Sequence, residues 1–116
     1  ILHPGATLRI DDASLLPIAL TRDGQDEALD ILSGGTREQL AILTRLAFAR
    51  LFARSGRAVP VILDDALVHS DDDRIEVMFT ALHRVAQDQQ IIVMTCRQRA
   101  FASLGGERLH ARVEWV

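Results

Sequence analysis

Apolar and polar positions divide the chain into two parts with different periods. In the first thirty residues, short apolar runs alternate with Asp11-Asp12 and with Arg22-Asp23-Gly24, and both polar stretches favour turns. The apolar runs occupy residues 7–10, 15–20 and 28–32. These runs predict three short antiparallel strands.

From residue 36 to about residue 54, apolar side chains recur at three- and four-residue spacing, which predicts an amphipathic helix. Gly34 and Gly35 interrupt the preceding run. Thr36 and Gln39 have the spacing of a capping box, in which side chains satisfy free amides of the first turn. We therefore expect the helix to begin at Thr36.

The second half of the chain predicts a strand, a helix and a strand. Residues 59–63 form a continuous apolar run, short enough for a strand buried on both faces. Residues 75–86 read as a helix, opened by acidic residues 71–73, whose negative charge suits the positive end of a helix dipole. Residues 91–94 predict the next strand, and the tail at 108–116 alternates like a final one.

A strand, helix and strand of these lengths form a crossover between parallel strands. Asp64 and Thr95, which directly follow the two apolar runs, should therefore lie at the same edge of the sheet. In open α/β sheets, ligands bind in crevices outside the carboxyl ends of the strands. The fold class expected is α/β, with parallel strands flanked by helices and a short antiparallel region at the N-terminus.

Composition limits the size class, the cysteine chemistry and the location expected of the protein. A chain of 116 residues, 48% of them apolar, has the size of one domain with a substantial core. No apolar run approaches the roughly 20 residues that span a bilayer, and no secretory signal is visible. Cys96 is the only cysteine, so neither an internal disulfide nor a paired-cysteine zinc site can form. We expect no membrane contact and a cytoplasmic location.

Charge gives two further limits. The net charge of -3 provides no overall basic field of the kind that drives nucleic-acid binding, so DNA contacts are expected in other regions. Every basic residue is Arg, so the lysine of a phosphate-binding P-loop is absent from this chain. The chain begins at Ile1 without an initiator Met, and we expect it to be part of a larger protein.

The segment Leu-Ser-Gly-Gly-Thr-Arg-Glu-Gln at residues 32–39 is a candidate phosphate-binding loop. Gly34 and Gly35 allow the backbone to approach a phosphate, the following helix directs its free amides there, and Ser33 adds a hydroxyl donor. Alternatively, the segment is a glycine-rich turn capped by Thr36.

Carboxylates follow the apolar run at 59–63. Asp64 offers the hard oxygen ligands that suit Mg²⁺ bound to phosphates, and Asp65 is placed to orient or deprotonate an attacking water. A polar boundary between strand and loop is the simpler alternative for this pair.

Two further groups of residues are weaker candidates for a functional site. His69 with the acids at 71–73 resembles a metal cluster, but helix capping and dipole compensation explain the acids. Cys96 and Arg97 follow the strand expected at 91–94, where Arg97 is placed to contribute positive charge to a phosphate. Cys96 is more simply an inert residue at a strand end.

The order of these segments is more specific than any one of them. The chain carries LSGGTREQ, a helix, VILDD, five residues, Asp71, a helix and IIVMT. This combination resembles the ABC-ATPase superfamily, and most closely the C-terminal lobe of its coiled-coil branch: SMC, RecN and the YhaN-like group associated with DNA repair and chromosomes. The resemblance covers residues 28–98.

The resemblance implies roles for single residues. It assigns Ser33, Gly34, Gly35 and Gln39 to the nucleotide of a partner head, Ser33 and the glycines to its γ-phosphate. It also matches Asp64 to the Walker-B aspartate that positions Mg²⁺, Asp65 to the catalytic position, and Asp71 to the dimer-contacting D-loop. Cys96 and Arg97 stand at the switch position.

Two departures from the family pattern concern turnover. Asp65 is one methylene shorter than the usual glutamate, which makes slow hydrolysis an expectation. The family commonly has histidine at the switch position, where this chain has Cys96 followed by Arg97.

The resemblance also implies an organisation. Coiled-coil ABC ATPases carry their P-loop lobe and this lobe at opposite ends of a long chain, so residues 1–116 are expected to be one lobe of a head. Its lead-in is residues 1–32, followed by the signature loop and helix at 33–54, the Walker-B strand to switch strand at 59–95, and a terminal segment at 96–116. The expected partners are the P-loop lobe and a second, identical head, and the isolated chain should be inactive.

Three functions follow from these observations. The first is an ATPase head lobe that hydrolyses ATP in a composite dimer, with Mg²⁺, in DNA repair or chromosome maintenance. The second is a clamp that dimerises with ATP without hydrolysis, which Asp65 and Cys96 favour. The third is a metal-dependent phosphoesterase using Asp64, Asp65, His69 and the acids at 71–73, which leaves the LSGG segment unexplained.

Overall fold

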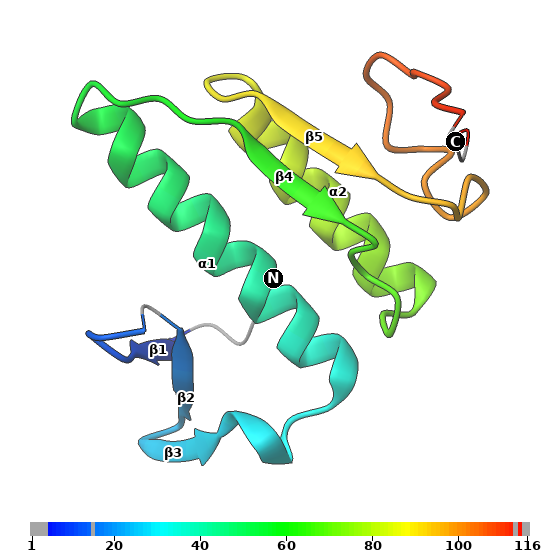
Figure 1. Cartoon of the computed structure of the whole chain (residues 1–116). Coiled ribbons are helices and arrows are strands. Elements are labelled where there is room, and N and C mark those ends of the chain that lie inside the picture. The colour runs from blue at the N-terminus through cyan, green and yellow to red at the C-terminus, as the bar shows by residue number, and fades with distance from the viewer. Residues whose placement is uncertain (1–4, 15, 113, 115–116) are drawn as a thin grey trace.

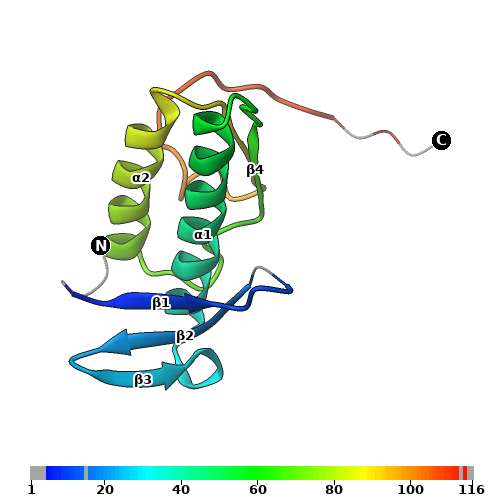
Figure 2. The same cartoon turned by 90° about the vertical axis from the view of Figure 1, so that its left-hand side faces the viewer.

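In the computed structural model, which describes residues 5–14, 16–112 and 114, the chain forms an antiparallel sheet followed by a helix-covered parallel sheet (Figure 1). The antiparallel sheet lies beside the N-terminal end of the first long helix, as Figure 2 shows. The mixed α/β class expected from the sequence is confirmed.

The antiparallel sheet has the order β1 (Thr7–Ile10), β2 (Pro17–Arg22) and β3 (Gln25–Ala28). Gly24 and Asp23 adopt positive φ angles of 76° and 48° in the turn between β2 and β3, which is the backbone that a tight hairpin requires. The strands expected at 7–10 and 15–20 are confirmed over the described residues, with the second shifted toward the turn; residue 15 lies outside them.

The strand expected at 28–32 is wrong. β3 ends at Ala28, and the chain then forms a single 3₁₀ turn, η1 (Leu29–Ile31). The hairpin register pairs Ala19 with Ala28, so continued pairing would lead to Pro17, which has no N–H group to donate. Pro17 therefore limits how far β3 can extend along β2.

The first long helix, α1 (Gly34–Arg54), begins two residues before the expected Thr36. Ser33 is its N-cap, and the Ser33 hydroxyl accepts a hydrogen bond from the Thr36 amide at 3.2 Å. Both glycines thus belong to the first helical turn.

The parallel unit consists of β4 (Val61–Asp64), α2 (Asp72–Ala86) and β5 (Ile91–Met94). β4 and β5 pair in parallel, with Asp64 opposite Met94. The expected crossover, and the expectation that Asp64 and Thr95 lie at one edge of the sheet, are both confirmed.

Both helices cover the same face of the β4–β5 sheet. Val61 and Leu63 point into this core, while Ile62, Ile92 and Met94 on the opposite face are 51%, 39% and 46% exposed. The core residues come from both helices, β4 and the segments that follow the strands: Ile42, Leu46, Ala49, Val61, Leu63, Leu67, Ile75, Met78, Phe79, Leu82 and Phe101. The expectation of a strand buried on both faces is wrong within this chain, because no described segment covers the second face.

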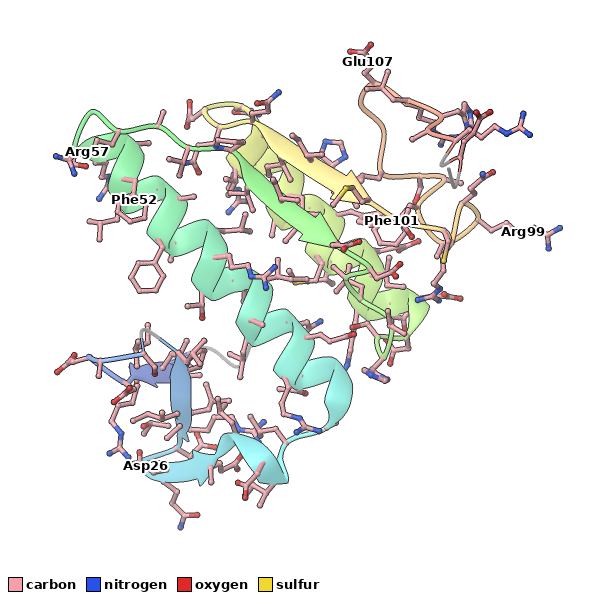
Figure 3. All side chains as sticks on the ribbon, viewed as in Figure 1. Asp26, Phe52, Arg57, Arg99, Phe101 and Glu107 are labelled. Carbon is pink, nitrogen blue, oxygen red and sulfur yellow. The ribbon has the colours of Figure 1, made fainter. Side chains whose placement is uncertain are left out.

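The segment after β5 folds back onto the helices. Phe101 packs on Phe79, with ring centroids 5.4 Å apart, and points toward the core in Figure 3. The strand expected at 108–116 does not form among its described residues, 108–112 and 114; residues 113, 115 and 116 lie outside the described part.

Within the part of the chain that the structure describes, no helix combines the length and the apolar character needed to cross a membrane.

Truncating the most buried side chain of α2 should destabilise the fold. Met78 is 0% exposed, so Met78→Ala is expected to lower the free energy of unfolding by about 2–5 kcal/mol, because it leaves a cavity in the core. Val77 is 40% exposed, and Val77→Ala should change it by about 0.5 kcal/mol or less. Urea unfolding of both variants measures the difference; equal destabilisation would contradict this core.

Candidate functional site

Two strands end and two helices begin at the same end of the molecule. β4 and β5 run toward it with their carboxyl ends, and α1 and α2 begin there, as Figure 1 shows. Ser33, Gly34 and Gly35, which we call the signature loop, lie at the start of α1. Residues 65–71, which we call the aspartate loop, connect β4 with α2. The free amides at the N-termini of α1 and α2 favour the binding of an anion at this end.

Glu38 fastens the two loops together. Its carboxylate accepts hydrogen bonds from the backbone amide of His69 at 2.9 and 3.0 Å and from the hydroxyl of Ser70 at 3.1 Å. A carboxylate that accepts several hydrogen bonds is a strong acceptor, because it carries a full charge. The N-terminal part of α1 therefore fixes the aspartate loop at a point 31 residues further along the chain.

The two glycines of the signature loop allow this close approach. A Cβ at Gly34 would lie 3.3 Å from the Cβ of His69, and one at Gly35 would lie 3.1 Å from the carbonyl oxygen of His69 and 2.9 Å from Nη1 of Arg74. The glycine pair thus has a structural reason within this chain. That reason is compatible with a phosphate on the other side of the loop.

Arg74 makes the second connection. Its Nη1 donates to the hydroxyl of Ser33 at 3.2 Å and to that of Thr36 at 3.1 Å. Its Nε lies 3.8 Å from a carboxylate oxygen of Asp71, whose other oxygen caps α2 by accepting from the Arg74 amide at 2.9 Å. A positive charge is therefore held beside the signature loop by the start of α2.

Asp64 and Asp65 stand at the end of β4 with exposed side chains. The amide of Asp65 donates to the carbonyl of Met94 at 3.0 Å, which extends the parallel ladder by one bond. Asp65 then turns sharply, with φ at 47°, and Cys96 Sγ lies 3.9 Å from its Oδ1. Asp is among the few residues that tolerate this left-handed backbone, which gives a reason for Asp rather than Glu at position 65.

Leu67 is a second residue with left-handed backbone, at φ 63°, and such a conformation is rare for a bulky side chain. Its side chain is 1% exposed, and its carbonyl accepts from Nη1 of Arg97 at 3.0 Å. Burial and this bond hold the aspartate loop in a strained shape. The guanidinium of Arg97 is thus engaged within the chain.

The structure brings most of the residues singled out from the sequence to this end. Ser33, Gly34, Gly35, Asp64, Asp65, Asp71, Cys96 and Arg97 all belong to these loops and ends. Gln39 differs, because it is 5% exposed and has little surface to present to a partner.

Glu38 and Arg74 are the residues that sequence reasoning missed as organisers of this end. Their contacts span 31 to 41 residues, and no local spacing reports such pairs.

Among the described residues, no three His, Cys, Asp or Glu side chains gather in an arrangement that could hold a metal ion by themselves. The ring of His69 lies beside the signature loop, since a Cβ at Gly34 would lie 3.4 Å from its Cγ.

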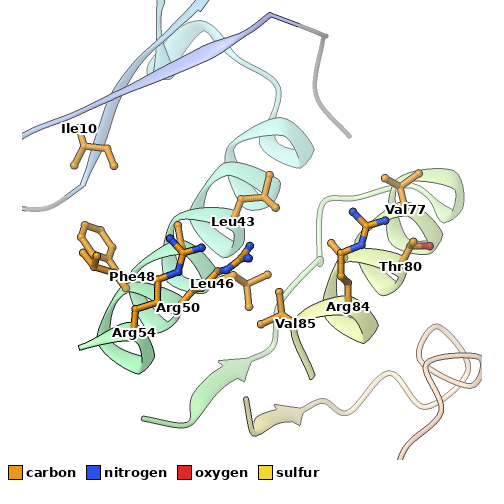
Figure 4. Close-up of a pocket in the computed structure, with 13 residues that line it drawn as sticks. Ile10, Leu43, Leu46, Phe48, Arg50, Arg54, Val77, Thr80, Arg84 and Val85 are labelled. Carbon is orange, nitrogen blue, oxygen red and sulfur yellow. The ribbon is translucent and has the colours of Figure 1, made fainter. Parts of the chain in front are cut away.

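A separate groove of about 810 Å³ lies between the later turns of α1 and α2 (Figure 4). Apolar side chains including Leu46, Phe48 and Val85 line it, together with the guanidinium groups of Arg50, Arg54 and Arg84. None of the candidate site residues lines this groove.

No protein-family model matches the chain. Uncharacterized proteins of Mycobacterium tuberculosis and Mycobacterium bovis are 39% identical to it over 95 residues, covering 82% of this chain and 11% of theirs. Protein YhaN of Bacillus subtilis is 34% identical over 83 residues, covering 70% of this chain and 8% of YhaN. The chain therefore spans only a small part of the length of these relatives.

A solved structure from the SMC ATPases, concerned with their ATP-driven dimerization and DNA-stimulated activation, shares the fold. The TM-score is 0.59 at 18% identity, and the match covers 94% of this chain and 66% of that one. The chain thus shares its fold with that SMC ATPase structure.

The hydrogen bonds that Glu38 accepts from His69 and Ser70 should keep the aspartate loop from opening. Glu38→Gln is expected to speed hydrogen exchange of the His69 amide by about 10- to 100-fold, because the amide loses a charged acceptor. Glu76→Gln, on an exposed position of α2, should leave that exchange unchanged. Residue-resolved hydrogen exchange by NMR measures both; unchanged protection in Glu38→Gln would show that these bonds do not hold the loop.

Proposed function

We propose that this chain is the C-terminal lobe of an ATPase head, in which two heads enclose ATP and hydrolyse it. The observation that carries the proposal is the meeting of the signature loop, the end of β4 and the aspartate loop at one end of the fold. The fold shared with an SMC ATPase supports the same reading.

In the proposed head, the signature loop and the end of β4 contact two different nucleotides. Ser33, Gly34 and Gly35 contact the γ-phosphate of ATP held by the neighbouring head, where the free amides of α1 face the negative charge. Asp64, at the end of β4, serves the nucleotide of its own head. The isolated lobe then neither binds ATP tightly nor hydrolyses it.

The donor set at the end of β4 fits Mg²⁺. Asp64 has an exposed carboxylate, and hard oxygen ligands from one or two carboxylates and the substrate phosphates are what Mg²⁺ takes in such sites. When bound, Mg²⁺ supplies positive charge that neutralises the phosphate oxygens.

Asp65 is proposed to act on the attacking water. Its carboxylate orients the water in line with the γ-phosphate and accepts a proton from it. Loss of the γ-phosphate removes the ligand of Ser33 in the neighbouring head, so the two heads separate. ATP and ADP thus differ in how well they hold the closed dimer.

The bare face of the β4–β5 sheet supports a P-loop lobe as the second partner. Parallel sheets are normally covered on both faces, yet Ile62, Ile92 and Met94 are exposed here. A lobe that adds strands and a second covering layer would bury these side chains. We propose that this lobe belongs to the same protein and that the second head is identical.

DNA is the proposed partner of the whole protein, in repair or chromosome maintenance. Support comes from the SMC ATPases, whose activation is DNA-stimulated in the structural neighbour. The chain has a net charge of -3, so other regions are proposed to make the DNA contact.

A clamp that dimerises with ATP but hardly hydrolyses it is the alternative. The short Asp65 side chain and the Cys96 thiol 3.9 Å from it favour this function, because neither group reaches as far as the glutamate and histidine of the family pattern. It predicts nucleotide-dependent dimers with negligible turnover.

Turnover separates the two functions. In a head assembled from this chain and its P-loop lobe, Asp65→Asn is expected to reduce the rate of ATP hydrolysis by about 100-fold or more, because it removes the proton acceptor. Asp88→Asn, at an exposed position two residues beyond the carboxyl end of α2, is the matched control and should retain the rate. Phosphate release measures both. No turnover in the unmodified head, with dimers still formed on ATP, would establish the clamp instead.

Dimerisation tests the role of the signature loop. Ser33→Arg is expected to abolish ATP-dependent dimers, because a long side chain fills the space of the neighbour's phosphate, while ATP binding by each monomer remains. Ser103→Arg, on an exposed position after β5, is the control. Light scattering with and without ATP measures dimers; a head that binds no ATP at all would overturn the family assignment.

A further inference from the structure

The hydrogen bonds of Ser33 fix the direction in which its hydroxyl can act. A serine hydroxyl has one proton to donate and two lone pairs with which to accept. The Ser33 hydroxyl accepts from the Thr36 amide at 3.2 Å and from Nη1 of Arg74 at 3.2 Å. Both lone pairs are thus used, and only the proton of Ser33 remains available.

The neighbouring hydroxyl is also engaged by Arg74. Thr36 Oγ1 lies 2.9 Å from the Ser33 hydroxyl and accepts from Nη1 of Arg74 at 3.1 Å. In the absence of a ligand, Thr36 Oγ1 is the acceptor for the Ser33 proton. A ligand that competes with Thr36 for this proton must present a strong acceptor, and an anionic oxygen is the strongest available.

Arg74 also carries charge to this point. Its side chain begins on α2, beside the aspartate loop, and its Nη1 reaches the signature loop across 41 residues of sequence. Its contact with Asp71 is made by Nε at 3.8 Å, on the other side of the guanidinium. The Nη1 donors that face Ser33 and Thr36 are therefore not used by that carboxylate.

We propose that Arg74 is the residue that prepares the signature loop for the neighbouring head's γ-phosphate: it turns Ser33 into an obligatory donor and adds positive charge beside it. This inference rests on the proposed function. It also gives the aspartate loop a direct influence on the signature loop of the same chain, because Asp71 and Arg74 share the start of α2.

Variants that differ in charge distinguish the proposed role of Arg74 from a purely structural link between the two helices. Arg74→Gln removes the charge and shortens the side chain by two atoms, whereas Arg74→Lys keeps the charge with fewer donors. Arg57, at the far end of α1 in Figure 3, is the matched control. All variants are made in the full-length protein, and each is checked for an unchanged melting temperature.

The first measurement compares ATP binding by monomers with ATP-dependent dimerisation. Arg74→Gln should weaken dimerisation by about tenfold or more, because a charged hydrogen-bonding group is lost, while the ATP affinity of the monomer stays unchanged. Arg74→Lys should recover part of the loss, and Arg57→Gln should behave like the wild type. Equal dimerisation of Arg74→Gln and wild type, or an equal loss in Arg74→Lys and Arg74→Gln, would overturn the inference.

Mixed dimers test whether Arg74 acts on the neighbour's nucleotide. Arg74→Gln heads are mixed with Asp64→Asn heads at a protein concentration at which neither variant turns over ATP alone. If Arg74 acts across the interface, each mixed dimer contains one intact composite site, and the mixture should regain about a quarter of the wild-type turnover. If Arg74 serves the nucleotide of its own head, no mixed site is intact and turnover stays absent, which contradicts the inference.

A mixture of Ser33→Arg with Asp64→Asn heads is the positive control for this design. Restored turnover there, without restoration in the Arg74 mixture, would reject Arg74 and leave the composite ATPase standing. If neither mixture regains turnover, the dimerisation measurement decides on Arg74. A wild-type protein that neither dimerises with ATP nor hydrolyses it would instead reject the proposed function itself.

Discussion

The parallel pairing of β4 with β5 requires the chain to return along the whole sheet between them, and α2 makes that return. Both strands then end, and both long helices begin, at the same end of the molecule. Every residue of the candidate site depends on this arrangement. Core packing of Leu63, Met78 and Leu46 holds the helices against one face of the sheet, so the loops at that end have a rigid base.

The signature loop and the aspartate loop are joined to each other by charged side chains. Glu38 holds the aspartate loop from α1, and Arg74 holds the signature loop from α2, so each helix fixes the loop that precedes the other. Charge-assisted bonds of this kind have strict geometry, because both donor directions and acceptor positions are fixed. The left-handed backbone at Asp65 and Leu67 persists within the same network. A composite nucleotide site would use such a preorganised surface.

One face of the β4–β5 sheet presents apolar side chains, and the end of the fold presents polar ones. The two surfaces suit different partners. Ile62, Ile92 and Met94 suit a partner that stays bound, because burial of apolar area is favourable whether or not a ligand is present. The signature loop, with its hydroxyls and glycines, offers contacts that matter only when an anion is present, and this suits a partner that binds and leaves.

Local sequence determined much of the fold. The period of apolar residues gave α1, α2, β4 and β5 within a few residues, and turn residues at 22–24 gave the β2–β3 hairpin. Local pattern failed at β3, where Pro17 on another strand limited the pairing, and at α1, where Ser33 rather than Thr36 became the cap. The Asp64 and Asp65 pair was visible because its meaning lies in its position directly after a strand. The roles of Glu38 and Arg74 were decided only by the tertiary structure. Contacts across 31 to 41 residues leave no periodic pattern in the sequence.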